Sequence, residues 1–128
     1  MGTAGDAEQL VLDLCEAFKK HDAEALRPFF TDDVVYHNIP MDAAVGIDAT
    51  IAFIEGFFGM SESLVIENLH VATRDNLVFT ERVDTFTIGD KVAPLPVMGI
   101  FEIRDGKICA WRDYFDMGQI TTMLSGDS

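Results

Sequence analysis

The spacing of apolar residues changes once along this 128-residue chain, near Ser63. Before that point apolar residues recur every three or four positions, as on one face of an α-helix. After it they alternate, as in a β-strand with one buried face. Helices followed by an antiparallel run of strands indicate an α+β fold, in which one face of the sheet packs on helices that lie on one side. We expect the curled sheet to enclose a pocket.

Residues before Ser63 are expected to form three helices and one strand. The helices are expected over 7–19, over 23–30 after the capping residue Asp22, and over 47–60 after Gly46. The strand, VVYHN, is expected over 34–38. Four further strands are expected over 64–72, 77–88, 95–103 and 107–115.

Length and composition are typical of one folded domain over residues 1–128. Hydrophobic residues make up 48% of the chain, and Pro and Gly are spread out rather than gathered into a linker. Only the two ends, 1–6 and 125–128, are expected to be frayed.

The charge of the chain argues against a nucleic-acid partner. The net charge is −13 with nine Lys and Arg, so the protein would repel a phosphate backbone. No apolar run reaches the roughly 18 residues that a membrane span requires. The N-terminal sequence MGTAGDAEQL lacks the basic and apolar regions of a signal peptide. We therefore expect a cytoplasmic protein that does not bind membranes.

No metal or cofactor motif is evident. Cys15 and Cys109 are too few and too far apart to build a metal cluster, and we expect both to pack as small hydrophobic residues. His21, His37 and His70 lack the spacing of metal ligands, and no phosphate-binding glycine loop or nucleophile elbow is present. Any chemistry is expected to come from side chains alone.

One carboxylate stands among apolar side chains in the last strand. Because side chains alternate along a strand, the segment ICAWRDYFD places Asp113 on one face with Cys109, Trp111 and Phe115. An aspartate is rarely buried unless another group pairs with it. The register of the neighbouring strands indicates which group that is.

The turn before the last strand allows two registers. The segment RDG at 104–106 could form a two-residue turn or a three-residue loop with glycine in the left-handed conformation. The two-residue turn would put a glutamate on the apolar face, so we predict the three-residue loop. In that register Val97 lies opposite Asp113, and Gly99 lies opposite Trp111 and leaves room for its indole.

The preceding turn, IGDK, suits a two-residue turn with glycine first. It sets Arg82 opposite Val97 and Asp84 opposite Leu95, although two prolines could introduce a bulge at the start of that strand. Arg82, Val97 and Asp113 would then share one row across three strands. The outer two backbones would be roughly 10 Å apart, a gap that an arginine side chain can bridge.

An arginine and two aspartates on one apolar face have two interpretations. They can form a structural salt-bridge network, although desolvation largely offsets the attraction in such a network. Alternatively, two carboxylates that share one guanidinium have separated proton affinities, which provides an acid and a base near neutral pH. The pattern leaves both open. Tyr36 and Asn38, on one face of VVYHN, could add hydrogen bonds in the same pocket.

Three motifs carry a resemblance to a known family: YHN at 36–38, TERVD at 80–84 and WRDYFD at 111–116. Their spacing resembles that of the limonene-1,2-epoxide hydrolase family, within the nuclear transport factor 2-like superfamily, from about residue 7 to residue 115. The resemblance implies a cone-shaped, cystatin-like fold with a curved mixed sheet packed on N-terminal helices. It also implies a homodimer formed through the sheet face and no cofactor.

The resemblance also implies a role for each polar residue. Asp113 would be the general base, Tyr36 and Asn38 would hold the attacking water, Asp84 would be the general acid, and Arg82 would bridge the two carboxylates. The implied reaction converts an epoxide to a vicinal diol in one metal-free step. An apolar, terpene-like or cyclic epoxide would bind among Leu95, Val97, Phe115, Trp111, Met60 and Leu124.

Two other functions fit the same fold. A ketosteroid isomerase-like or polyketide cyclase-like enzyme would use Asp113 to move a proton from carbon and Tyr36 to stabilise an enolate. Such an enzyme would not need Arg82 between two acids. A non-catalytic small-molecule-binding module would hold the acids only as a buried network.

Overall fold

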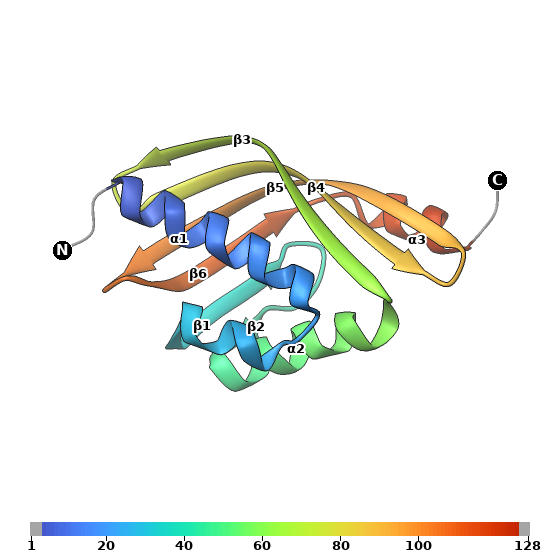
Figure 1. The fold of residues 1–128 in the computed structure, drawn as a ribbon, viewed down its shortest axis with the longest axis horizontal. Helices are drawn as coiled ribbons and strands as arrows, with labels where there is room; N and C mark the ends of the chain where they lie inside the picture. The colour runs from blue at the N-terminus through green and yellow to red at the C-terminus, as the bar shows by residue number, and fades with distance from the viewer. Residues whose placement is uncertain (1–3, 126–128) are drawn as a thin grey trace.

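A six-stranded mixed sheet forms the body of the molecule in the computed structural model, which describes residues 4–125 (Figure 1). Its strands, in the order β2-β1-β6-β5-β4-β3, are β1 (Phe30–Asn38), β2 (Ala44–Val45), β3 (Ser63–Arg74), β4 (Leu77–Ile88), β5 (Lys91–Arg104) and β6 (Lys107–Tyr114). β1 runs parallel to β6, and the other neighbouring strands are antiparallel. The expected α+β class is confirmed, with β2 as an additional short strand.

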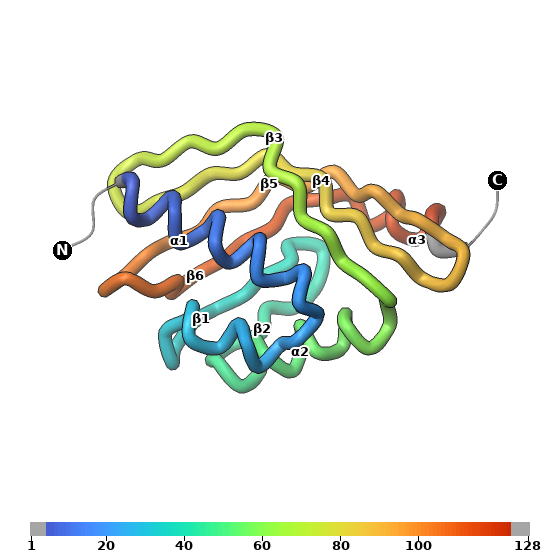
Figure 2. Tube along the Cα trace, in the orientation of Figure 1, coloured from blue at the N-terminus to red at the C-terminus, as the bar shows by residue number. Residues whose placement is uncertain are grey.

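The helices pack on the sheet and beside it (Figures 1 and 2). They are α1 (Ala4–Ala17), the 3₁₀ helices η1 (Phe18–Lys20) and η2 (Glu24–Phe29), α2 (Ile47–Met60) and α3 (Met117–Ser125). α1 crosses the sheet and packs against β3, α2 packs against β1, and α3 packs against β5. A pocket lies between one end of the sheet and residues of η1, α2 and α3.

Three expectations about the helices need correction. Residues 4–6 are not frayed but form the first turn of α1, whereas 1–3 and 126–128 lie outside the described residues. The segment expected as a helix over 23–30 is a 3₁₀ helix, because Pro28 lacks the N–H that a longer α-helix would use. Ser125, also expected to be frayed, is the last residue of α3, a helix that the sequence did not predict.

The hydrophobic core lies between α1, α2 and the inner face of the sheet. Trp111 of β6 is fully buried there, with its ring 5.8 Å from Phe18 in an edge-on contact and 4.8 Å from Phe101. Cys15 is also buried in this core, as expected, while Cys109 is half-buried. The inward-facing side chains of the central strands therefore fill the core toward one end and face a pocket toward the other.

The register predicted between β4 and β5 is confirmed. Arg82 pairs with Val97 and Asp84 pairs with Leu95. The pairing is continuous through Pro94 and Pro96, so neither proline introduces a bulge. β5 has already passed the end of β6 at these positions, so one of its edges is unpaired and can accommodate a residue without an N–H.

The register predicted between β5 and β6 is wrong. Arg104 pairs with Lys107 around a two-residue turn, in which Asp105 and Gly106 have φ of 53° and 75°. A bulge then follows, with Cys109 as the additional residue of β6. The bulge restores the two faces that the tight turn alone would exchange, so the apolar residues of both strands still point inward.

The bulge changes which residues lie opposite one another. Asp113 pairs with Gly99 rather than with Val97, and Trp111 pairs with Phe101 rather than with Gly99. The expected row of Arg82, Val97 and Asp113 therefore does not form. Thr80, Gly99 and Asp113 form a row instead. Arg82 lies two residues along β4 from Thr80, and its side chain reaches Asp113 diagonally.

No helix within residues 4–125 is long and apolar enough to cross a membrane. The cytoplasmic location stays a prediction from the sequence.

Candidate active site

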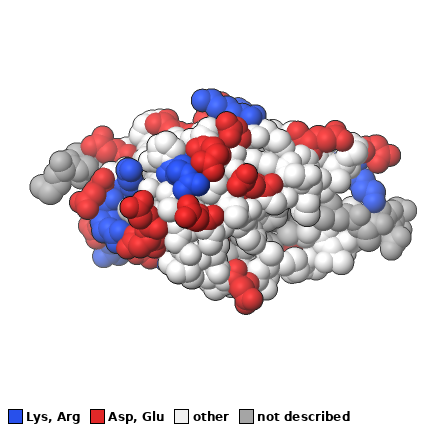
Figure 3. All heavy atoms as spheres, turned by 90° about the horizontal axis from the view of Figure 1, so that it is seen from below, with Lys and Arg blue, Asp and Glu red and all other residues white. Residues whose placement is uncertain are grey.

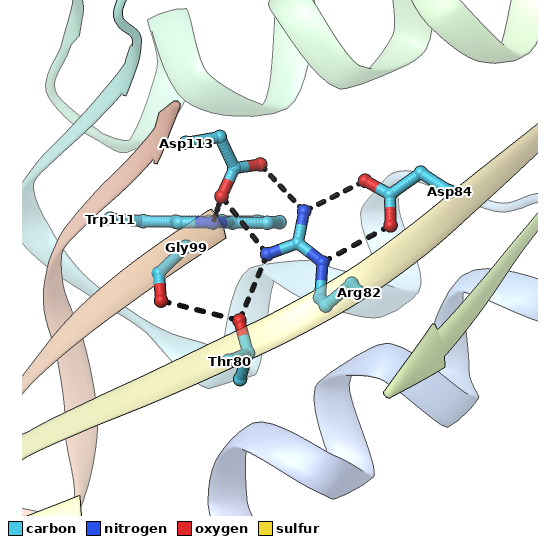
Figure 4. Close-up of polar contacts among 6 residues, drawn as sticks. All are labelled: Thr80, Arg82, Asp84, Gly99, Trp111 and Asp113. Atoms are coloured by element: carbon cyan, nitrogen blue, oxygen red, sulfur yellow. Dashed lines mark hydrogen bonds and ion pairs between the residues drawn. The ribbon is translucent and has the colours of Figure 1, made fainter. Parts of the chain in front are cut away.

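The guanidinium of Arg82 lies between the carboxylates of Asp84 and Asp113 (Figure 4). Nε and Nη2 donate to the two oxygens of Asp84 at 3.1 and 2.7 Å, and Nη1 and Nη2 donate to the two oxygens of Asp113 at 3.0 and 2.9 Å. Nη1 also donates to Thr80 Oγ1 at 3.3 Å. Arginine has five N–H donors, and all five are engaged here. Arg82, which is 1% exposed, can hold the acids but has no donor left for a ligand.

Gly99 makes the diagonal reach of Arg82 possible. A Cβ at this position would overlap Arg82 Nη1 and lie 2.5 Å from Asp113 Oδ1. Thr80, directly opposite on β4, donates its hydroxyl to the carbonyl of Gly99 at 3.3 Å. The expectation that Gly99 makes room for the Trp111 indole is therefore wrong, because its open space holds the ion pair.

Asp113 has two partners in the buried interior. Besides Arg82, the indole Nε1 of Trp111 donates to Asp113 Oδ1 at 2.7 Å. The two side chains lie two positions apart on β6 and so share a face. Two carboxylate oxygens offer about four acceptor positions, and three N–H groups occupy three of them. The remaining position is on Oδ2, which accepts from Arg82 alone among the described residues.

The parallel pairing of β1 with β6 brings Tyr36 and Asn38 to the same place. Tyr36 pairs with Trp111, and Asn38 pairs with Asp113. The rings of Tyr36 and Trp111 stack with centroids 4.3 Å apart, and both Tyr36 and Asn38 are buried. Burial and the nearby charge of Asp113 raise the pKa of Tyr36 above its usual range, so its hydroxyl stays a donor.

Burial also acts on the two groups at the centre of the site. Burial raises the pKa of Asp84, and this outweighs the opposing attraction of Arg82, while the charge of Asp113 raises it further. Burial opposes the charge of Arg82, yet the carboxylates of Asp113 and Asp84 hold its pKa well above its usual range. One guanidinium balances the charge of one ionised carboxylate, so the other carboxyl group can keep its proton. The raised pKa of Asp84 favours its neutral form.

These polar groups open onto an apolar pocket with about 420 Å³ of empty space, which includes space open to solvent. Its lining residues are Phe18, Tyr36, Asn38, Phe57, Leu64, Ile66, Asp84, Phe86, Leu95, Val97, Trp111, Asp113, Phe115 and Ile120. Seen from the side of α2, charged side chains are most numerous at the left of the view and along its upper edge, and the lower central part of this face is largely uncharged (Figure 3). A few polar groups at one wall of an apolar space are typical of a small-molecule site.

Most of the predicted lining residues lie in this pocket, including Leu95, Val97, Trp111 and Phe115. Met60 does not: it is 57% exposed and lines a neighbouring space. The side chain of Leu124 lies outside the described part of the chain. Sequence reasoning missed six residues of the lining, although alternation on β4 placed Phe86 on the same face as Asp84. They are Phe18, Phe57, Leu64, Ile66, Phe86 and Ile120.

Comparison with known proteins connects this geometry to a family. The family model of the limonene-1,2-epoxide hydrolase catalytic domain matches residues 6–126. The chain belongs to the limonene-1,2-epoxide hydrolase family. One similar protein is "Epoxide hydrolase EphG" of Mycobacterium tuberculosis. It is 30% identical over 101 residues, which make up 79% of this chain and 67% of the relative.

Solved structures show the same fold. An M. tuberculosis limonene-1,2-epoxide hydrolase-like epoxide hydrolase superposes with a TM-score of 0.84 at 27% identity, covering 96% of this chain and 92% of the other. A putative polyketide cyclase from Xanthomonas campestris pv. campestris gives a TM-score of 0.85 at 20% identity, covering 94% and 98%. The second likeness shows the fold alone, so the family assignment rests on the sequence match.

In this limonene-1,2-epoxide hydrolase family member, all five residues to which the resemblance gave roles lie together. Arg82 contacts Asp84 and Asp113, while Tyr36 and Asn38 line the same pocket from β1. Their roles in catalysis stay predictions. Within the described residues, no group of three or more His, Cys, Asp or Glu side chains is placed to hold a metal ion.

Proposed function

We propose that this family member adds water to an apolar epoxide and yields a vicinal diol in one general acid/base step that uses no metal. The observation that carries the proposal is the single buried guanidinium that holds two carboxylates on the wall of an apolar pocket. Membership of an epoxide hydrolase family supports the choice of reaction.

Asp113 is the proposed general base. Its Oδ2 keeps one acceptor position, which can take a proton from a water molecule. The hydroxyl of Tyr36 and the amide of Asn38, both buried and two positions apart on one face of β1, offer that water further hydrogen bonds. A water held by three groups is oriented before it reacts, which lowers the entropic part of the barrier.

Asp84 is the proposed general acid. Burial raises its pKa, so it retains the proton that the epoxide oxygen needs when the ring opens. Arg82 fixes both carboxylates without contacting the substrate, because its five donors are engaged. It is therefore a positioning residue.

The proton count of this step is balanced. The water oxygen forms a bond to one ring carbon while the bond from that carbon to the epoxide oxygen breaks. Asp113 gains the proton of the water, and Asp84 gives its proton to the opened oxygen. Transfer of one proton from Asp113 back to Asp84 restores the starting state.

The pocket supports an apolar substrate. Leu95, Val97 and Phe115 surround the acids with hydrocarbon, and no cation with a free donor contacts them there among the described residues. A cyclic or terpene-like epoxide, as the family resemblance implies, could bury most of its surface in such a space. No specific observation favours an isomerase, a cyclase or a non-catalytic binding module over this reaction.

An assay of diol formation from limonene oxide, cyclohexene oxide and styrene oxide tests the proposal. The wild-type protein should turn over at least one of them. Asp113→Asn and Asp84→Asn should each lower turnover by about a hundredfold or more, because each removes one proton transfer. Asp75→Asn, in the exposed turn before β4, is the matched control and should not change the rate. Absence of diol from every epoxide contradicts the proposal.

We also propose that the protein is a homodimer formed through the outer face of the sheet. Met98 and Tyr114 pair across β5 and β6 and are each 49% exposed, which leaves apolar surface uncovered. Sedimentation equilibrium at micromolar concentration should give the mass of a dimer, and Met98→Glu should shift it toward the monomer. A monomeric wild-type protein excludes this arrangement.

A further inference from the structure

A second apolar space adjoins the active-site pocket. Its empty space, which includes space open to solvent, is about 340 Å³, and it shares four of its walls with that pocket, namely Phe57, Phe86, Leu95 and Ile120. Its other described walls are Met60, Ile88, Ala93 and Met123, so every described residue that lines it is apolar. We call this space the tail chamber.

We propose that the tail chamber binds an unbranched alkyl chain of the substrate, so that the enzyme prefers terminal epoxides carrying such a chain over compact cyclic ones. This inference rests on the proposed function and deepens it, because it names the substrate class of the same site. The proposal follows from the direction of the chamber, its walls and its junction with the pocket.

The chamber begins at Phe86, one inward-facing residue beyond the proposed general acid Asp84, and follows the strands. Asp84, Phe86 and Ile88 are successive inward-facing residues of β4, with Ala93 of β5 directly opposite Phe86. Two residues of antiparallel strand span about 6.8 Å, so Ile88 lies about 14 Å beyond Asp84. An epoxide with its oxygen at Asp84 would direct a substituent past Phe86 toward the β4–β5 turn.

Two helices close the chamber along this path. Phe57 and Met60 lie three positions apart on α2, and Ile120 and Met123 lie three positions apart on α3, so each pair presents one helix face. α3 lies at the same end of the molecule as the β4–β5 turn (Figure 1). Methionine side chains adapt to irregular apolar ligands, which suits chains of differing length.

The walls also determine the chemistry of the occupant. A polar group inside the chamber would lose its hydrogen bonds to water without gaining new ones from these walls. At the junction with the pocket, the rings of Phe57 and Phe86 lie with centroids 5.8 Å apart. Rings at this separation are in contact, so a substituent passes beside the pair rather than between the rings, and a slender methylene chain suits that path better than a second ring system.

A chain-length series on the wild-type protein tests the inference. The terminal epoxides of hexene, octene, decene and dodecene differ only in the length of the alkyl chain. Burial of one methylene is worth about 0.8 kcal/mol, which corresponds to about a fourfold gain in kcat/KM. We expect kcat/KM to rise at least tenfold from the hexene to the decene epoxide and to level off once the chamber is full.

A variant that fills the chamber provides the second test. Ala93 is buried, so Ala93→Leu places three additional carbon atoms in the tail chamber. The ratio of kcat/KM for the decene epoxide to that for cyclohexene oxide should fall at least tenfold. Ala72→Leu makes the same substitution at an exposed position of β3 and should leave this ratio unchanged.

The outcomes separate this inference from the proposed function. No turnover of any epoxide contradicts the proposed function itself. Turnover with kcat/KM independent of chain length contradicts the tail chamber while the hydrolase proposal stands. An unchanged ratio in a folded Ala93→Leu protein also contradicts it, and if that variant does not fold, the wild-type series decides alone.

Discussion

Gly99 determines whether Arg82 can reach Asp113. Its missing side chain leaves the space in which Nη1 of Arg82 meets the carboxylate, with Thr80 Oγ1 only 3.0 Å from where a Cβ would be. Alternation along β5 was enough to place Gly99 on the inner face. The bulge in β6 was needed to align it with Asp113, and so its role could not be predicted from the sequence.

Gly99→Ala should therefore disrupt the site. We expect turnover to fall by about a hundredfold, because a small displacement of aligned groups has effects of this size. Overpacking should also lower the free energy of unfolding by about 1–3 kcal/mol. Diol formation and urea denaturation measure the two effects. Gly56→Ala is the matched control, since nothing lies within 4 Å of its Cβ in α2. A Gly99→Ala protein with normal turnover contradicts this role.

The raised pKa of Asp84 predicts the pH dependence of activity. Burial raises this pKa above the unfolded value of about 3.9, so the protonated acid persists to higher pH in the folded protein. Its contribution to stability is present below about pH 3.9 and is lost as pH rises through the folded pKa. The active acid form is lost over the same rise, so kcat/KM should fall on the alkaline side.

The pH profile of Asp84→Asn checks this assignment. Asparagine does not titrate, so the residual rate of the variant should lack the alkaline decrease that Asp84 causes in the wild type. Persistence of the same decrease in the variant assigns it to another group and removes Asp84 from the role of general acid.

Among the elements, the antiparallel strands were largely predictable and the parallel pair was not. The turn at Gly89 set the β4–β5 register because the sequence there allows one tight turn. The β5–β6 register failed because a bulge lets a two-residue turn keep the same faces inward. The pairing of Asn38 with Asp113 joins segments far apart in the chain, and local alternation carries no information about it.

The β5–β6 turn itself can be tested. Gly106 has φ of 75°, and nothing lies within 4 Å of the place that a Cβ would take, so an alanine there meets conformational strain rather than a clash. Gly106→Ala should lower the free energy of unfolding by about 1–2 kcal/mol. Gly106→Asn, which tolerates this conformation, should cost less. Equal stability of the alanine variant and the wild type in urea contradicts the turn described here.

The molecule as a whole combines a packed interior with a hollow end. Trp111 belongs to both, because its ring packs in the core while its indole N–H holds Asp113. The periodicity of the sequence predicted the α+β class, and its motifs predicted which polar residues line the pocket. It did not predict the wall formed by Ile120 of α3, because a short C-terminal helix carries little periodic signal.

The origin of the diol oxygen distinguishes a base from a nucleophile at position 113. In a single turnover with excess enzyme in heavy-oxygen water, a base mechanism places the label directly in the diol. If the carboxylate of Asp113 attacked carbon instead, the first diol would contain an unlabelled carboxylate oxygen, and an ester-linked intermediate would be detectable by mass spectrometry. Labelled diol in the first turnover is the result we expect, because Tyr36 and Asn38 provide a site for water beside Asp113. Unlabelled first-turnover diol would contradict the mechanism.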